Sequence, residues 1–237
     1  GARWTWRGAA RGIAYDGEGR VYAGTGVDWG DFNGDQHPDL AATSFYGEVK
    51  PLFLNLGEAV FQERSSAWGA AAAGLSDVAF GVRSLDWDND GRQDLMVANG
   101  HIQENAGALR REAAYLQPIR LFHNAGSRFV TAHGGWPAVV GRALATADLD
   151  NDGGMDAVAT NLEGQPLLLR NTASRGHWLG LRLMGRAPNS MALGAQVEIR
   201  GGGRTQLREV HTAGSYMSAN DARVHFGLGS EAEVERV

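Results

Sequence analysis

The sequence predicts an all-β protein in which a partial β-propeller is followed by a small β-sandwich. The chain of 237 residues has 34 glycines but only 6 prolines, which is typical of many turns and short strands. An aspartate-rich segment occurs three times, 55 and then 62 residues apart, and each copy precedes apolar runs of strand length. A repeat of about 50 to 60 residues holds roughly four short strands, which is one propeller blade.

The three aspartate-rich segments align without gaps as nine-residue loops. They span residues 31–39, 86–94 and 148–156. Predicted strands follow at residues 40–43, 95–99 and 157–161. A second predicted strand in each copy ends in an asparagine, at Asn55, Asn124 and Asn171. In the first two copies another phenylalanine follows, at Phe61 and Phe129. The similarity therefore extends well beyond the loops, as repeated blades require.

The second copy carries an insertion. Its ninth loop position lies 30 residues before the asparagine, against 16 in the first copy, so about 14 extra residues lie within residues 101–117. Residues 106–115 predict a short helix. The segment also contains Glu104, Glu112 and Tyr115, which could belong to a lid or a binding loop. We favour a solvated connector, and we expect His101 to be a surface or packed residue rather than a catalytic one.

Beyond the third copy the aspartate loops stop and strands divided by glycine turns begin. The predicted strands span residues 177–183, 195–200, 205–211 and 222–226. A hairpin turn is expected at residues 201–203, and residues 233–237 look like a further strand cut off midway. We place the domain boundary near Ser174, with blades in residues 1–173 and a truncated β-sandwich in residues 174–237.

The composition argues against several functions. A hydrophobic fraction of 43% and a charged fraction of 21% describe a globular chain with a core. No apolar stretch approaches the roughly 20 residues of a membrane-spanning helix, so we expect no membrane insertion. The net charge of −5 without a basic cluster argues against nucleic-acid binding. Because the chain has no cysteine, disulfides, thiolate metal sites and a cysteine nucleophile are ruled out.

The loops have the chemistry of calcium sites. Positions 1, 3, 5 and 9 present twelve side chains, of which eleven are aspartate and one is Asn33. Such crowding of negative charge is costly unless a cation cancels it, and Ca²⁺ prefers sets of oxygen ligands. We therefore predict about three structural calcium ions, with position 7 contributing its backbone carbonyl. The predicted ligands are Asp31, Asn33, Asp35, His37 and Asp39, then Asp86, Asp88, Asp90, Arg92 and Asp94, and finally Asp148, Asp150, Asp152, Gly154 and Asp156.

Position 6 distinguishes the three loops. Gly91 and Gly153 permit the tight turn there, whereas the first loop has Gln36, so we expect the first site to be the weakest. These loops are not EF-hands, because the twelfth position lacks a bidentate glutamate. That position is filled by Ala42, Val97 and Ala159.

The pattern D-x-[DN]-x-D-G-x-x-D, leading into an apolar strand and preceded in the second copy by Phe80-Gly81, resembles the FG-GAP/VCBS repeats of integrin-α-type propellers. The tail resembles the ASPIC/UnbV domain at residues 177–179, 194–197, 214–218 and 225–229. Together the two parts resemble the cartilage acidic protein/UnbV family over nearly the whole chain. The resemblance implies a secreted or cell-surface calcium-binding propeller, usually of seven blades, followed by a β-sandwich.

Three repeats, even with a partial blade in residues 1–25, cannot close such a propeller, and the tail stops before a last strand. We therefore expect the chain to be part of a longer protein.

Three functional hypotheses remain open. The first is an extracellular, cell-surface or periplasmic recognition or adhesion module, not an enzyme, that binds a protein or glycan ligand. The second is an accessory factor or enzyme of UnbV-type natural-product biosynthesis, although no H-E-x-x-H, G-x-S-x-G or P-loop motif occurs. The third is a structural spacer. We favour the first, and we expect the seven tryptophans to pack in the core rather than to stack on sugars.

Overall fold

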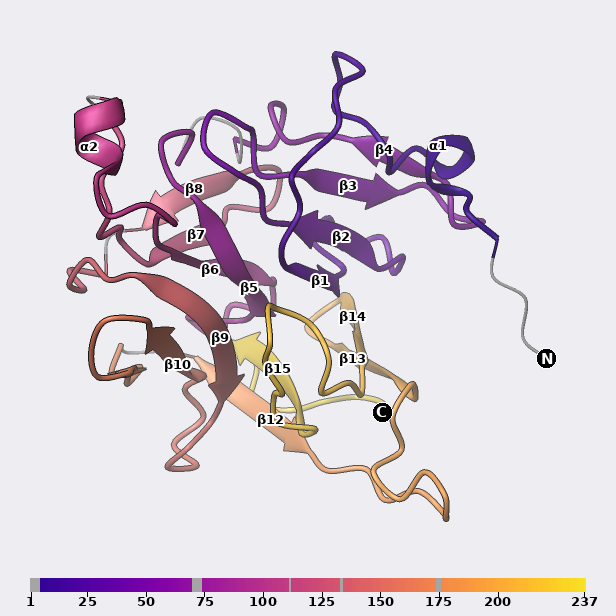
Figure 1. Cartoon of the computed structure of the whole chain (residues 1–237). Helices are drawn as coiled ribbons and strands as arrows, with labels where there is room; N and C mark the ends of the chain where they lie inside the picture. The colour runs from indigo at the N-terminus through magenta and orange to yellow at the C-terminus, as the bar shows by residue number, and fades with distance from the viewer. Residues whose placement is uncertain (1–4, 70–73, 111, 133, 174–175) are drawn as a thin grey trace.

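The computed structural model describes residues 5–69, 74–110, 112–132, 134–173 and 176–237. Its strands form three consecutive propeller blades and, after them, two small sheets (Figure 1). This arrangement confirms the predicted all-β class with a partial propeller. Within the described ranges, no helix has the length and apolar character needed to cross a membrane.

Each blade is an antiparallel sheet whose strands lie in sequence order. The first blade contains β1 (Val27–Gly30), β2 (Asp39–Ala42), β3 (Leu52–Asn55) and β4 (Phe61–Glu63). The second contains β5 (Ala79–Leu85), β6 (Asp94–Asn99), β7 (Arg120–Asn124) and β8 (Phe129–Ala132). The third contains β9 (Gly141–Ala147), β10 (Asp156–Asn161) and β11 (Leu167–Leu169), with no fourth strand among its described residues. The two phenylalanines noted in the sequence thus begin β4 and β8.

The nine-residue loops join the first and second strand of each blade. The register places the residue before each loop opposite the last loop position. The pairs are Gly30 with Asp39, Leu85 with Asp94, and Ala147 with Asp156. Each loop is therefore a hairpin connection closed at both ends by the strand ladder, which fixes its shape in the same way three times.

The blades pack face to face, and β6 shows how. Its side chains alternate between two cores because successive residues of a strand point to opposite faces. Leu95 and Val97 belong to the core shared with the first blade, whereas Met96 and Ala98 belong to the core shared with the third. Every residue of β6 is buried as a result.

The C-terminal region consists of two antiparallel strand pairs around a separate core. Strand β12 (His177–Leu181) pairs with β15 (Val224–Gly229), and β13 (Gln196–Gly201) pairs with β14 (Arg204–Glu209). The apolar side chains between them are Val197, Ile199, Val210, Val224 and Phe226. The predicted boundary at Ser174 lies outside the described residues.

The turn predicted after β13 is confirmed as a two-residue hairpin. Gly202 and Gly203 have φ of 56° and 72°, the left-handed values that such turns need. The strand predicted for residues 233–237 is not formed as such. Of this stretch, Arg236 alone makes an isolated bridge, to Arg200.

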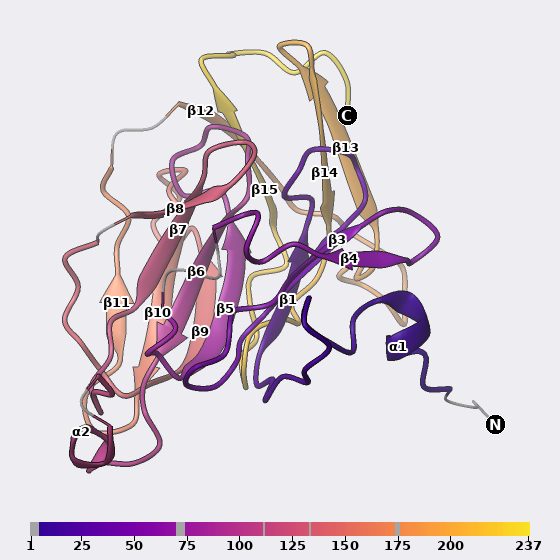
Figure 2. The same ribbon diagram turned by 90° about the horizontal axis from the view of Figure 1, so that it is seen from above.

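The C-terminal sheets lie along one side of the blades, next to β1 and β5 (Figure 2). Their connecting segment, residues 211–221, bonds to the first strands of two blades. Ser215 N donates to Val27 O of β1 at 2.8 Å. In β9, Leu144 N donates to Ser218 Oγ at 3.2 Å and Thr146 N donates to Asn220 Oδ1 at 3.0 Å. The two parts of the chain are therefore built against each other, which the sequence did not predict.

Two further expectations about local structure are wrong. The helix predicted for residues 106–115 is reduced to α2 (Ala106–Leu109), because Arg110 is extended, with φ of −145° and ψ of 121°. The partial blade expected in residues 1–25 is absent from the described residues 5–25, which hold α1 (Gly8–Arg11) and turns but no strand. His101 is packed as expected, with 5% of its surface exposed.

The tryptophans behave differently from one another. Trp68 is buried in the core, as expected. Trp87 and Trp136 are half-buried and pack against the core between the second and third blades. The expectation is wrong for Trp6 and Trp178, which are exposed. Trp4 lies outside the described residues.

Candidate metal sites in the three loops

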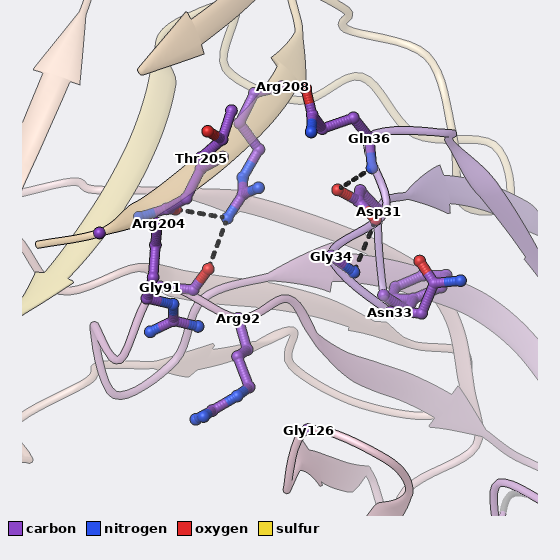
Figure 3. Close-up of a pocket in the computed structure, with 13 residues that line it drawn as sticks. Asp31, Asn33, Gly34, Gln36, Gly91, Arg92, Gly126, Arg204, Thr205 and Arg208 are labelled. Carbon is purple, nitrogen blue, oxygen red and sulfur yellow. Dashed lines mark hydrogen bonds between the residues drawn. The ribbon is translucent and has the colours of Figure 1, made fainter. Parts of the chain in front are cut away.

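The first aspartate of each loop organises the loop backbone. Asp31 accepts hydrogen bonds from Gly34 N at 2.8 Å, Asp35 N at 3.0 Å and Gln36 N at 2.9 Å. Figure 3 shows the backbone of Gly34 and Gln36 turned toward this carboxylate. These bonds give a partner to backbone N–H groups that a short turn leaves without a backbone acceptor.

The same bonds recur in the other two loops. Asp86 accepts from Asp90 N at 3.1 Å and from Gly91 N at 2.9 Å. In the third loop the equivalent bonds reach Asp148 from Asp152 N and Gly153 N, both at 3.1 Å. The sequence repeat is therefore a repeat of hydrogen-bonding geometry and not of composition alone.

The last aspartate of each loop closes it and ties it to the third strand of the blade. One carboxylate oxygen accepts the N–H of the second loop residue, and the other accepts the N–H of the asparagine that ends the third strand or, in the third blade, follows it. The three acceptors are Asp39, Asp94 and Asp156. The three asparagine donors are Asn55, Asn124 and Asn171.

Two of these asparagines also connect one blade to the loop of the blade before it. Asn124 Nδ2 donates to Phe32 O in the first loop at 2.8 Å. Asn171 Nδ2 donates to Trp87 O in the second loop at 2.7 Å. Asn124 and Asn171 are thus inter-blade contacts, whereas Asn55 Nδ2 donates to Pro38 O in its own blade.

Positions 4 and 6 of every loop are left-handed. At position 4, Asn and Gly tolerate this backbone best. Those residues are Gly34, Asn89 and Asn151, with φ of 77°, 58° and 59°. At position 6 the angles are 69° for Gln36, 90° for Gly91 and 84° for Gly153. The glycine requirement inferred from the sequence is correct, and Gln36 adopts the same strained backbone without being glycine.

Three groups of side chains bring metal-ligating atoms within 4.8 Å of one another in the described residues. One lies in the second loop, one in the third, and one combines the second loop with a histidine of β7. They are Asp86 with Asp88 and Asp90, Asp148 with Asp150 and Asp156, and Asp88 with Asp94 and His123. The first loop has no such group of acidic or histidine residues, and its position 3 is Asn33.

Burial changes the acidity of several loop carboxyls. It raises the pKa of Asp39, Asp86 and Asp94 to about 7, and it also raises the pKa of Asp31. Burial in a poorly polarisable environment disfavours the charged form of a carboxyl unless an opposite charge is near. A divalent cation supplies that charge. The donor set therefore fits a hard cation held by oxygen ligands.

The hydrogen bonds and acidic clusters of the loops do not test every predicted ligand. The position-7 residues His37, Arg92 and Gly154 were expected to contribute carbonyl oxygens, and that role stays a prediction. The side chain of Arg92 forms an ion pair with Asp90, and His37 Nδ1 lies 3.4 Å from Asp35 Oδ1.

Sequence reasoning missed the residue before each third-strand asparagine. This position is Leu54 in the first blade, His123 in the second and Arg170 in the third. His123 Nδ1 lies 3.5 Å from Asp88 Oδ2, and Arg170 forms an ion pair with Asp150, where both aspartates occupy loop position 3. The change from leucine to histidine and arginine at this position was visible when the residues before the three asparagines were aligned.

The C-terminal region also contacts the loops. Gly227 N donates to Asp86 Oδ2 at 3.1 Å, so this carboxylate bonds to both parts of the chain. Arg204 Nη1 donates to Asp90 O at 2.8 Å, and Arg208 Nη2 lies 3.4 Å from Gly91 O. Figure 3 shows Arg204 and Arg208 facing the first two loops across a cavity of about 390 Å³.

Three equivalent hairpin loops on consecutive blades define this molecule as a repeat-containing propeller protein. Residues 31–97 and 86–159 each match the FG-GAP-like repeat, and each match spans two consecutive loops. Residues 185–237 match the domain described as ASPIC and UnbV. The chain therefore belongs to the FG-GAP-like repeat family and carries an ASPIC and UnbV domain at its C-terminal side, as the sequence resemblance implied. No curated protein matches the chain.

FG-GAP-like repeats are typical of extracellular proteins. Both FG-GAP-like repeats and ASPIC and UnbV domains are generally repeat or accessory domains without catalytic activity.

Proposed function

We propose that this protein is an extracellular calcium-binding module that recognises a protein or glycan ligand, with calcium ions acting structurally in the blade loops. One observation carries the calcium assignment: the same geometry of buried aspartates occurs in all three loops, and burial raises the pKa of four of these carboxyls. Asp86 and Asp94 support it most strongly, because both are buried and have a pKa raised to about 7. A bound cation would offset the cost of ionising them.

Calcium fits these loops better than other common divalent ions. The predicted side-chain ligands are all oxygen donors, which excludes the sulfur-rich sets that zinc prefers in structural sites. The third loop offers Asp148, Asp150 and Asp156 within 4.8 Å. Magnesium demands a near-octahedral set and keeps much of its water, whereas calcium accepts irregular carboxylate and carbonyl sets.

A structural role follows from the position of the loops. Each one closes the hairpin between the first two strands of a blade, and its last aspartate bonds to the third strand. Ion binding that requires this arrangement adds its free energy to the stability of the fold. Extracellular modules hold calcium with dissociation constants of about 10⁻⁴ to 10⁻³ M, which suits a location outside the cell.

The test is a calcium titration of EDTA-treated protein by calorimetry, with thermal melts of the same samples. We expect about three sites and a melting temperature that rises with calcium concentration. Asp156→Asn should remove one site, whereas Asp16→Asn should remove none, because Asp16 lies in a turn outside the loops and bonds to Arg20. A titration without heat and a melting temperature unchanged by calcium would show that the loops are ordinary turns.

A further inference from the structure

A second cavity, of about 400 Å³, opens beside the second loop on the side of the third blade. It is lined by residues from β7, from the loop and from the segments that follow β8 and β11. The residues that matter here are Trp87, Trp136, Asp88, Asp94, His123 and Arg170. Its volume is that of a small-molecule site, and its lining combines aromatic and polar groups.

Two indoles form the apolar part of the cavity. The ring centroids of Trp87 and Trp136 are 5.8 Å apart and their planes meet at 78°. Each ring packs partly against the core between the second and third blades, so its position is fixed, while the rest of the ring borders the cavity. A fixed aromatic corner offers flat apolar surface at little cost in conformational entropy.

The opposite part of the cavity is polar. Asp88 and His123 are partly exposed, with 38% and 37% of their side-chain surface accessible, and His123 Nδ1 lies 3.5 Å from Asp88 Oδ2. Carboxylate oxygens accept hydrogen bonds from hydroxyl groups, and a neutral imidazole can donate one and accept one. Apolar and hydrogen-bonding surfaces thus face the same space, as a ligand with a flat C–H face and several hydroxyls requires.

The charges favour a neutral ligand over an acidic one. The guanidinium of Arg170 is already paired with Asp150, and Asp88 and Asp94 add negative charge. An anionic ligand would therefore meet like charge without a free cation among the described lining residues. The cavity near Arg204 and Arg208 is lined by arginines instead, so an acidic sugar is a useful control for binding at that cavity.

We propose that this cavity binds a neutral hexose unit of a glycan, with one sugar face stacked in the corner of Trp87 and Trp136 and its hydroxyls bonded to Asp88 and His123. This inference rests on the proposed recognition function and names its ligand class. Asp88 and Asp94 also belong to the predicted second calcium site. Calcium occupancy is therefore expected to strengthen sugar binding, because it fixes one wall of the cavity.

The experiment measures binding of methyl α-mannoside, methyl β-glucoside and methyl β-galactoside by saturation-transfer NMR and tryptophan fluorescence, with glucuronate as the acidic control. Measurements are made in calcium and in EDTA, with thermal melts of the same samples. At least one hexoside should bind more tightly than glucuronate, with an affinity that is higher in calcium.

Three variants locate the site. Trp136→Ala should weaken binding about tenfold, because it removes one stacking surface. His123→Leu should weaken it about threefold or more through a lost hydrogen bond, and it copies Leu54 of the first blade, so it keeps a residue that the fold accepts there. The control is Trp6→Phe, which should leave binding unchanged because Trp6 is exposed and does not line the cavity.

The outcomes separate this inference from the proposed function. If calcium raises the melting temperature but no hexoside binds, the sugar site is wrong and the calcium proposal stands. Equal binding by wild type, Trp136→Ala and His123→Leu would also refute this cavity as the site. If a hexoside binds and both variants weaken it while calcium changes neither melting temperature nor affinity, the sugar site holds and the calcium proposal fails.

Discussion

Position 6 of the loops gives a graded test, because three equivalent residues share one backbone conformation. Gln36, Gly91 and Gly153 all have positive φ, between 69° and 90°. A left-handed backbone costs a residue with a Cβ about 1–2 kcal/mol. Glycine avoids that cost, but it makes the unfolded chain more flexible, which lowers the free energy of unfolding by about 0.5–1 kcal/mol. Gln36→Gly should therefore raise the free energy of unfolding by about 0.5–1 kcal/mol.

The reverse changes should destabilise to different extents. In Gly91→Ala the new Cβ would lie 3.0 Å from Gln206 Nε2 and 3.2 Å from Gly227 O, tight contacts that add to the backbone cost. We expect a loss of about 2 kcal/mol. In Gly153→Ala the Cβ would overlap the indole of Trp178, which must move away from its stacking partner His225. We expect a loss of about 3 kcal/mol.

The assay is thermal and urea unfolding of the three variants at saturating calcium. For a chain of this size, about 1 kcal/mol corresponds to a shift of roughly 2–4 °C in melting temperature. We expect the melting temperature to be highest for Gln36→Gly, lower for the wild type, lower again for Gly91→Ala and lowest for Gly153→Ala. Losses in the two alanine variants no larger than the gain in Gln36→Gly would show that contacts with the C-terminal region do not matter there. A destabilised Gln36→Gly would refute the claim that the first loop is strained.

Three further predictions concern buried polar groups. Because burial raises the pKa of Asp39, Asp86 and Asp94 to about 7, the calcium-free folded state keeps protons that the unfolded chain loses above about pH 4. The stability of this calcium-free state should fall as pH rises toward 7, so EDTA-treated protein should melt at a higher temperature near pH 5 than near pH 8. Calcium should cancel or reverse this order. A calcium-bound protein that still melts at a higher temperature near pH 5 would contradict the prediction. Burial lowers the pKa of Lys50 to about 8, so the folded state releases this proton at a lower pH than the unfolded chain does. The free energy of unfolding should therefore rise between about pH 8 and 10. Urea unfolding tests this prediction, because Lys50→Met should lack the rise. Asn124→Ala removes two buried and one partly buried side-chain hydrogen bond and should cost about 3 kcal/mol in urea unfolding. A loss below about 0.5 kcal/mol would argue against the inter-blade contact.

Much of the propeller was predictable because its information is local. The hairpin loops are encoded by aspartates at fixed spacing and by glycine or asparagine where φ is positive. The apolar runs after them became β2, β6 and β10, and Phe61 and Phe129 begin β4 and β8. Such features depend on neighbours in sequence, so a repeat makes them visible.

The rest depends on contacts between distant residues. Apart from Phe80-Gly81 in β5, the first strands β1, β5 and β9 carry no motif of their own. The position of the C-terminal region depends on contacts such as that of Ser215 with Val27. The helix predicted in the insertion shows the same limit. Local propensity favoured residues 106–115, yet a helix of that length without a side-chain cap at its start has little to stabilise it.

The positions of the candidate metal loops were predictable from the sequence, but their surroundings were not. The fifteen loop residues followed from the repeat, whereas the partners of the loops come from elsewhere in the chain. His123 and Arg170 differ from Leu54 at one repeat position, which becomes meaningful only when the third strand is seen beside the loop. Gly227, which bonds to Asp86, is 141 residues away in sequence.

The asparagines that end the third strands have a consequence for communication along the protein. The backbone of Asn124 bonds to the last residue of the second loop, and its side chain bonds to the first loop. Asn171 connects the third loop to the second in the same way. Consecutive loops are therefore linked by one asparagine, which is hydrogen-bonded to both of them, so a change in one loop can move the loop before it. Occupancy of one loop should bias the next, so the ions would bind as a series of coupled events rather than as three independent ones.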